Sequence, residues 1–213
     1  MSEYHKIQTV FLRDPDTKFK TLLQGQWALP EFEYLAGNQW RFTEKVNGTN
    51  IRIMVHPQHH DIRFEFGGKT DNASIPAFLV NRLEQIFRPK DSLLKEMFPD
   101  GACLYGEGYG AKIQKGGGNY KPTQDFVLFD VRVGDWWLQY ENVLDVAQKL
   151  ELDFVPISGT GTLHDLIALV REGFTSNWGN FPAEGIVARP LIELKARSGH
   201  RIITKLKTQD FQK

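Results

Sequence analysis

Apolar and polar residues alternate along most of the chain, and the period of the alternation predicts the secondary structure. Segments 50–56 and 61–66 show the period of two that is typical of half-buried strands. Segment 125–133 is almost continuously apolar, as in a strand that is buried on both faces. Segment 77–88 has apolar residues at helical spacing, between Ser74 as the expected N-cap and Pro89. The same criteria predict strands over 40–46, 102–107, 154–157, 184–189 and 201–207, and helices over 91–98, 141–150 and 163–173.

The first 40 residues carry a weaker pattern, in which 7–11 reads as a short strand and 21–23 as a turn into the loop around Pro30. Farther on, Asn47-Gly48 is a pair favoured in tight turns that need a positive φ. This pair predicts a hairpin that joins segment 40–46 to segment 50–56. Segment 61–66 would then be the third strand of the same antiparallel sheet.

The predicted strands outnumber the predicted helices, and most of them are joined by hairpin-like connections. This arrangement is typical of an α+β fold with antiparallel sheets flanked by helices, and it differs from the strand–helix alternation of a doubly wound fold. No repeat, low-complexity segment or linker divides the sequence. We therefore expect residues 1–213 to form one domain.

The composition is that of an ordinary globular protein, with 41% hydrophobic and 24% charged residues. No apolar run approaches the roughly 18 residues of a membrane helix, and the first residues lack an apolar signal core. We therefore expect a cytoplasmic protein without a membrane partner. The net charge is zero, but residues 189–213 carry seven basic and two acidic residues, which favours contact with phosphates there.

Two groups of reactive side chains are weak candidates for a site. Cys103 is the only cysteine, so an internal disulfide and a cysteine-based metal cage are excluded. His56, His59 and His60 cluster beside Pro57 between two predicted strands without acidic neighbours, which does not favour a metal site. The glycine-rich segment 108–120, which contains two lysines, is expected to be a loop.

The strongest candidate is Lys45, in the segment Glu44-Lys45-Val46-Asn47-Gly48-Thr49-Asn50. Taken alone, Lys45 is a solvated lysine at the mouth of a hairpin. The segment nevertheless resembles the Lys-x-[Asp/His/Asn]-Gly motif of the covalent nucleotidyltransferases, which comprise ATP-dependent DNA and RNA ligases and mRNA-capping guanylyltransferases. It is most similar to RNA ligases that resemble the second RNA ligase of phage T4 and the trypanosome RNA-editing ligases.

Four further segments resemble the remaining motifs of this family, in the family's order and at predicted strands. The resemblance extends from Trp40 to Lys207. The matching segments are Tyr105-Gly106-Glu107, Phe126-Val127-Leu128-Phe129-Asp130, Glu184-Gly185-Ile186-Val187 and Lys205-Leu206-Lys207.

The resemblance implies a nucleotidyltransferase (ATP-grasp-like) domain with a nucleotide pocket between its sheets. In this family Lys45 is the nucleophile that takes AMP from ATP, and burial or nearby cations favour the neutral amine that it needs. Lys205 and Lys207, two residues apart, would point to one face and neutralise the α-phosphate. Glu184 and Glu107 would assist a Mg²⁺ or Mn²⁺ ion.

Further residues are implied to hold the nucleotide. Glu107 would bind the ribose, and Phe129 would stack on the adenine, with Phe126 as the alternative. The full implied set of nucleotide-binding residues is Glu44, Asn50, Lys69, Glu107, Phe129, Glu184, Lys205 and Lys207.

Three features depart from the family. Asn47 stands where the most similar ligases have histidine, and it cannot act as an acid or base near neutral pH. Lys69 is the best match to an arginine that approaches the substrate phosphate, with Arg52 and Arg63 as rivals, and lysine lacks the two-pronged guanidinium. The sequence also stops at Lys213, whereas full-length relatives continue into a helical or OB-fold domain.

The sequence therefore predicts an ATP-dependent RNA ligase whose partners are RNA ends or a nicked duplex with a 5′-phosphate and a 3′-hydroxyl. A separate or missing C-terminal domain is expected as a further partner. Two alternatives stay open, namely the core of a DNA ligase or capping guanylyltransferase, and a non-catalytic nucleotide- or RNA-binding module of the same fold.

Overall fold

The computed structural model describes residues 3–57 and 64–212. The chain divides into two compact units, each with its own sheet. Unit 1 consists of Met1–His5 and Asn47–Val155, and unit 2 consists of Lys6–Val46 and Pro156–Lys213. The chain therefore passes from one unit to the other three times. The expectation of one domain over 1–213 stays a prediction.

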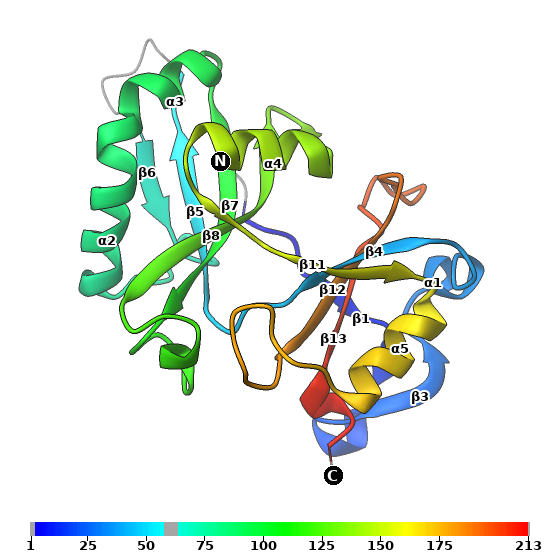
Figure 1. The fold of residues 1–213 in the computed structure, drawn as a ribbon. Coiled ribbons are helices and arrows are strands. Elements are labelled where there is room, and N and C mark those ends of the chain that lie inside the picture. The colour runs from blue at the N-terminus through cyan, green and yellow to red at the C-terminus, as the bar shows by residue number, and fades with distance from the viewer. Residues whose placement is uncertain (1–2, 58–63, 213) are drawn as a thin grey trace. The chain divides into compact units, whose positions relative to one another are not determined.

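Unit 1 contains a six-stranded sheet in which β10, β8, β7, β5 and β6 follow one another and β9 pairs with β8. All neighbours are antiparallel except β10 and β8, which are parallel. Figure 1 shows this sheet with its helices. The strands are β5 (Thr49–Val55), β6 (Phe64–Gly67), β7 (Ala102–Gly110), β8 (Gln124–Val133), β9 (Trp136–Trp137) and β10 (Asp153–Phe154).

One face of this sheet is covered by helices, and the other face carries both polar and aromatic side chains. Ile51, Ile53 and Leu104 point into a core that includes residues of all three α-helices of this unit. Because side chains alternate along a strand, Arg52 and Glu107 point to the opposite face. The helices of unit 1 are α2 (Ala77–Phe87), η2 (Arg88–Lys90), α3 (Asp91–Met97), η3 (Gly117–Asn119) and α4 (Tyr140–Lys149).

Unit 2 contains a five-stranded sheet in the order β1, β13, β12, β4 and β11, and a separate pair of β2 and β3. The β1–β13 pair is parallel and the other neighbours are antiparallel. Phe42, Ile186 and Leu206 point from three neighbouring strands into the core of this unit. The elements are β1 (Gln8–Thr9), β2 (Phe11–Arg13), η1 (Pro15–Thr17), β3 (Leu22–Trp27), α1 (Pro30–Tyr34), β4 (Trp40–Glu44), β11 (Ile157–Gly161), α5 (Leu163–Glu172), β12 (Gly185–Pro190), β13 (Thr204–Lys207) and η4 (Thr208–Asp210).

The predicted hairpin at Asn47-Gly48 is wrong. β4 pairs with β11 and β12, whereas β5 pairs with β6 and β7, so the two strands belong to different sheets. Gly48 does not have a positive φ, and glycine is required there for another reason. A Cβ atom at Gly48 would lie 2.3 Å from the Gly108 carbonyl oxygen and 2.6 Å from Cγ of Glu107. The glycine therefore permits close approach of this segment to β7.

The α+β class is confirmed, and most strands and helices lie where the pattern predicts them. The exceptions lie mainly at connections. Segment 21–23 is the start of β3 and not a turn, and the loop expected around Pro30 is α1. Segment 154–157 contains the end of β10 and the start of β11, which belong to different sheets. α2 begins after Pro76 without a side-chain cap, so the expected Ser74 cap is wrong. Among the described residues, no helix is long and apolar enough to cross a membrane.

Candidate active site

Lys45 lies immediately after β4 in unit 2, and its ammonium group contacts Glu184. The Lys45 backbone N–H donates to the Gly185 carbonyl oxygen at 2.9 Å, which continues the pairing of β4 with β12. Its Nζ donates to Oε2 of Glu184 at 2.7 Å. The other oxygen of Glu184, Oε1, lies 2.8 Å from Nζ of Lys207. One carboxylate therefore bridges the two lysines.

Strand register explains why residues so distant in sequence meet. β12 lies between β4 and β13, with Ile186 opposite Glu44 and Gly185 opposite Lys207. Glu184 precedes β12 and is therefore close to the ends of both neighbouring strands. Leu206 is buried in the core, so its neighbours Lys205 and Lys207 point to the other face, as predicted from their spacing.

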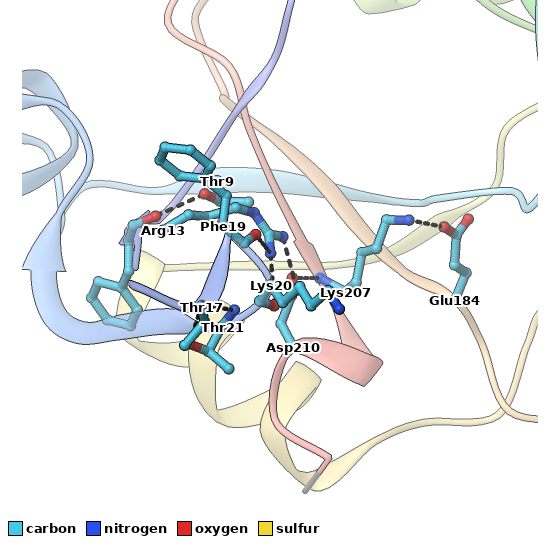
Figure 2. A network of polar contacts seen from close by, with 10 residues as sticks. Thr9, Arg13, Thr17, Phe19, Lys20, Thr21, Glu184, Lys207 and Asp210 are labelled. Carbon is cyan, nitrogen blue, oxygen red and sulfur yellow. Dashed lines mark hydrogen bonds and ion pairs between the residues drawn. The ribbon is translucent and has the colours of Figure 1, made fainter. Parts of the chain in front are cut away.

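Lys207 is also held through its backbone, as Figure 2 shows. Its N–H donates to Oδ2 of Asp210 at 3.0 Å, and Oδ1 of Asp210 accepts from Arg13 at 2.8 Å. The side chain of Lys207 extends from this fixed point to Glu184. The end of β13 is thus tied both to η4 and to β2.

Glu44, beside the candidate nucleophile, is 1% exposed. Its Oε1 accepts from the Ser176 hydroxyl at 2.6 Å, and its Oε2 accepts from the backbone N–H and the side-chain amide of Asn177 at 2.7 and 2.8 Å. Both carboxylate oxygens are thus used within unit 2. Ser176 and Asn177 carry no signal in the sequence, because both lie in a loop that has no periodicity.

In unit 1, Asn50 and Glu107 lie opposite each other, on the face of the sheet that points away from the helices. Oδ1 of Asn50 is buried and has no hydrogen-bond partner among the residues that the structure describes. Phe126 is 1% exposed and packs edge-on against Phe87 in the core. Phe129 is half-buried, with the ring of Tyr4 at 5.2 Å and 73°. Phe129 therefore remains the aromatic candidate for the nucleobase.

The three candidates for the phosphate-binding cation differ in their surroundings. Arg52 is fully buried and donates to the Gly68 carbonyl at 2.8 Å and to Asp71 at 2.8 Å. Lys69 is exposed in the same loop. Arg63 lies outside the described residues. Arg52 thus anchors the loop that carries Lys69.

The glycine-rich loop contacts the backbone that follows Lys45. The Tyr120 hydroxyl accepts from the Asn47 N–H at 3.3 Å, and the Gln114 side-chain amide donates to the Gly48 carbonyl at 3.2 Å. Neither side chain was identified in the sequence.

Cys103 and His56 are the weak candidates that lie within the described residues. Burial raises the pKa of the Cys103 thiol, which is 3% exposed and therefore a poor nucleophile. His56 lies 3.6 Å from Glu65, while His59 and His60 lie outside the described residues. Within residues 3–57 and 64–212, no three histidine, cysteine or carboxylate side chains gather as a metal cluster.

The predicted site residues thus form two sets. Lys45 and Lys207 both contact Glu184 in unit 2, and Lys205 points to the same face of the sheet as Lys207. The second set lies in unit 1 and consists of Asn50, Lys69, Glu107 and Phe129.

Comparison with solved structures supports the fold. A mutant of the Naegleria gruberi RNA ligase in its apo form superimposes with a TM-score of 0.68 at 19% identity, over 99% of this chain and 56% of that one. A second mutant with ATP and Mn also has a TM-score of 0.68 at 19% identity, over 97% and 56%. The N. gruberi RNA ligase with PPi has a TM-score of 0.65 at 19% identity, over 97% and 56%.

The chain thus spans little more than half the length of these structures. No curated protein matches the sequence significantly. The family model for RNA ligases matches residues 38–207, which is most of the chain and includes every motif from Lys45 to Lys207. The chain therefore belongs to the RNA ligase family.

Proposed function

We propose that this protein is an ATP-dependent RNA ligase in which Lys45 accepts AMP. The observation that carries the proposal is the pair of contacts by which Glu184 joins Lys45 to Lys207, in a chain of the RNA ligase family. This cluster combines a nucleophile, a carboxylate and a cation that can face a phosphate. Several N. gruberi RNA ligase structures hold ATP or AMP together with Mn, which supports this choice of nucleotide and ion.

In the first step, Nζ of Lys45 attacks the α-phosphorus of ATP. A nitrogen–phosphorus bond forms, the bond to the pyrophosphate oxygen breaks, and the amine loses a proton. An RNA 5′-phosphate oxygen then displaces Lys45 and takes the AMP. Finally an RNA 3′-hydroxyl attacks the 5′-phosphate, which forms the phosphodiester bond and releases AMP.

Lys205 and Lys207 supply positive charge beside the attacking amine. Both point to the face that carries Lys45, because Leu206 between them points into the core. Fixed cations stabilise the charge that develops on phosphoryl oxygens in the transition state.

Glu184 fits a role in binding Mg²⁺ or Mn²⁺. It supplies one carboxylate, and magnesium is commonly held by one or two carboxylates together with phosphates and water. A divalent cation bound there would neutralise phosphate charge. Glu107 is the second proposed carboxylate.

The residues of unit 1 are proposed to hold the nucleoside. Asn50 and Glu107 offer polar atoms for the ribose, and the buried Oδ1 of Asn50 is an acceptor that a ribose hydroxyl would satisfy. Phe129 offers a half-buried ring for the adenine. Lys69, exposed in the loop that Arg52 anchors, is proposed to meet a phosphate of the RNA end.

RNA is the proposed polynucleotide partner, and a basic surface of unit 2 supports this. Arg41 and Arg189 are register partners on β4 and β12. Beyond β12, residues 191–203 form a hairpin, which we call the basic hairpin, in which Lys195 pairs with Arg201. Lys195 and Arg197 are exposed on it. Such a surface attracts the phosphodiester backbone.

The alternatives differ in their reaction with nucleotides. A capping guanylyltransferase would form the adduct with GTP, a DNA ligase core would form it with ATP but join DNA ends, and a non-catalytic module would form none. The match of the family model for RNA ligases favours RNA joining over the first two.

The test is covalent labelling with radiolabelled ATP or GTP and magnesium, followed by denaturation. ATP should label the protein through a bond that acid breaks and base does not, as for a phosphoramidate. Lys45→Ala should abolish the label, while Lys20→Ala, which changes an exposed lysine of the same unit, should keep it. Label that persists after Lys45→Ala would disprove the assignment of the nucleophile.

A further inference from the structure

We propose that Ser176 and Asn177 form an anchor that positions the nucleophile through Glu44, and that Glu44 does not use its carboxylate to bind the nucleotide. The inference rests on the proposed role of Lys45. Ser176 and Asn177 act as positioning residues, since their polar atoms contact Glu44 and not Lys45.

The contacts of Glu44 are those of a fixed structural carboxylate. It is 1% exposed, and it accepts three hydrogen bonds of 2.6 to 2.8 Å from Ser176 and Asn177. Hydrogen bonds to an ionised group are short and strong, and a buried carboxylate without them would be costly. A nucleotide would therefore have to break these bonds before it could use the same oxygens.

The backbone around Glu44 transmits this constraint to Lys45. The Glu44 N–H donates to the Pro156 carbonyl at 3.0 Å, and the Lys45 N–H donates to the Gly185 carbonyl at 2.9 Å. These bonds hold the chain on both sides, because Pro156 precedes β11 and Gly185 begins β12. Consecutive residues of a strand point to opposite faces, so the Glu44 side chain holds the chain from the face opposite to the Lys45 amine.

The loop that carries Ser176 and Asn177 also leads directly to Glu184, the partner of Lys45. Residues 174–183 connect α5 to the start of β12, and Glu184 follows them. The loop is closed by bonds from Ala183 N–H to the Phe174 carbonyl at 2.9 Å and from Ser176 N–H to the Phe181 carbonyl at 2.8 Å. Asn177 also donates to the Ser158 hydroxyl at 3.2 Å. One loop therefore fixes both Glu44 and the approach to Glu184.

Positioning of this kind affects the rate of attack more than nucleotide affinity, because a misplacement of about 1 Å can slow a reaction about a hundredfold. The test measures single-turnover formation of the lysyl adduct at saturating ATP, together with the ATP concentration for half-maximal rate. We expect Asn177→Ala and Ser176→Ala to lower the rate constant about tenfold or more and to change the half-saturating concentration less than about twofold.

Asn180→Ala is the matched control, because it removes the same side chain from an exposed position of the same loop. It should behave as the wild type. A single-turnover rate constant reports only on folded, active molecules, so a loss of stability alone would not lower it. Rate constants of Ser176→Ala and Asn177→Ala that stay within about twofold of the wild type would overturn the proposal.

A readout that needs no ATP separates this inference from the proposed function. Without nucleotide, Lys45 is held by Glu184 at 2.7 Å, so its labelling by an amine-reactive reagent should accelerate in Asn177→Ala and not in Asn180→Ala. Mass spectrometry identifies the labelled residue. Unchanged labelling would overturn the anchor, whereas accelerated labelling without any ATP adduct in the wild type would overturn only the proposed function.

Discussion

At the residue scale, the chemistry of the site depends most on the carboxylate of Glu184. Its two oxygens contact the ammonium groups of Lys45 and Lys207 at 2.7 and 2.8 Å, and its side chain is 14% exposed. A carboxylate between two cations holds both in place, and in the proposed reaction it would also be a ligand for a divalent cation. Removal of this group should therefore affect attack more than folding.

The first prediction concerns this carboxylate. Glu184→Ala should slow formation of the lysyl adduct at least about a hundredfold, which corresponds to about 3 kcal/mol of barrier. The measurement is single-turnover labelling with ATP and Mg²⁺ or Mn²⁺, compared with the same assay in EDTA. Glu172→Ala, an exposed carboxylate on α5, is the control and should react normally. Full activity of the wild type in EDTA would refute a metal role.

The second prediction concerns Gly48. Gly48→Ala should lower the free energy of unfolding by about 1–3 kcal/mol, because its Cβ would lie 2.3 Å from the Gly108 carbonyl oxygen and force the backbone apart. The measurement is urea denaturation. Gly37→Ala is the matched control, since a Cβ there meets nothing within 4 Å. Equal destabilisation by the two substitutions would mean that close approach at Gly48 does not matter.

At the element scale, Asp125 joins α2 and Lys121, which directly follows the glycine-rich loop, to the start of β8. Its carboxylate accepts from the Lys121 ammonium, from the Phe126 N–H at 3.0 Å and from Arg82 at 3.2 Å. Burial alone would raise the pKa of Asp125, but these hydrogen bonds lower it. The resulting pKa of Asp125 lies below the ordinary value of 3.8. The ionised form therefore stabilises the fold above that value, and this contribution disappears as the pH falls through the lowered pKa.

The third prediction follows from the direction of this pKa shift. Asp125→Asn should lower the free energy of unfolding by about 1–3 kcal/mol at neutral pH, because a charged acceptor is lost, and the difference should shrink toward pH 3. Urea denaturation at three pH values measures it. Asp145→Asn, which removes the exposed pair of Asp145 with Lys149, should change stability by less than about 1 kcal/mol. A difference that is constant with pH would contradict the assignment.

The fourth prediction concerns the basic hairpin. If Lys195 and Arg197 contact RNA phosphates, the double substitution to alanine should reduce the slope of log affinity against log salt concentration by about 1.4 to 1.8. Titration of a fluorescent nicked RNA duplex at several salt concentrations measures this slope. Lys18→Ala with Lys20→Ala removes the same charge from another exposed loop of unit 2 and should leave the slope unchanged. An unchanged slope in the hairpin variant would place the RNA elsewhere.

The sequence predicts helices and strands well where the buried positions repeat at a regular spacing. α2, β5 and β12 were predicted within a few residues, because their buried positions recur at the helical or strand period. This spacing does not show which strands belong to the same sheet. β4 pairs with β11 and β12, which lie far along the chain, so the local turn signal at Asn47-Gly48 led to the wrong partner.

The same distinction holds for the site. Lys45, Glu184 and Lys207 were found because they occur in family motifs, and their contacts were observed in the structure. Ser176 and Asn177 belong to no motif and no periodic segment. Their relation to Glu44 depends on the path of a loop, which a single sequence does not reveal.

At the scale of the whole molecule, the chain has two separate hydrophobic cores, one for each unit. Leu104 and Ile186 are fully buried representatives of the two cores. The core of unit 2 is built from residues on both sides of unit 1, whereas the core residues of unit 1 all lie between Asn47 and Val155.

The fifth prediction tests the independence of these cores by native-state hydrogen exchange. Leu104→Ala should accelerate exchange mainly in the strands of unit 1, and Ile186→Ala mainly in those of unit 2, because each leaves a cavity in its own core. Equal acceleration across all strands after either substitution would show a single cooperative unit instead.

The three crossings of the chain have a genetic consequence. Unit 1 is encoded largely as an insertion between the two halves of unit 2, and the codons for Lys45 and Glu184 lie on opposite sides of that insertion. A gene divided within the glycine-rich loop would therefore put the proposed nucleophile, Lys45, on one product and Glu184 on the other. Neither product would be active alone, and restored labelling after co-expression would report reassembly of the two halves.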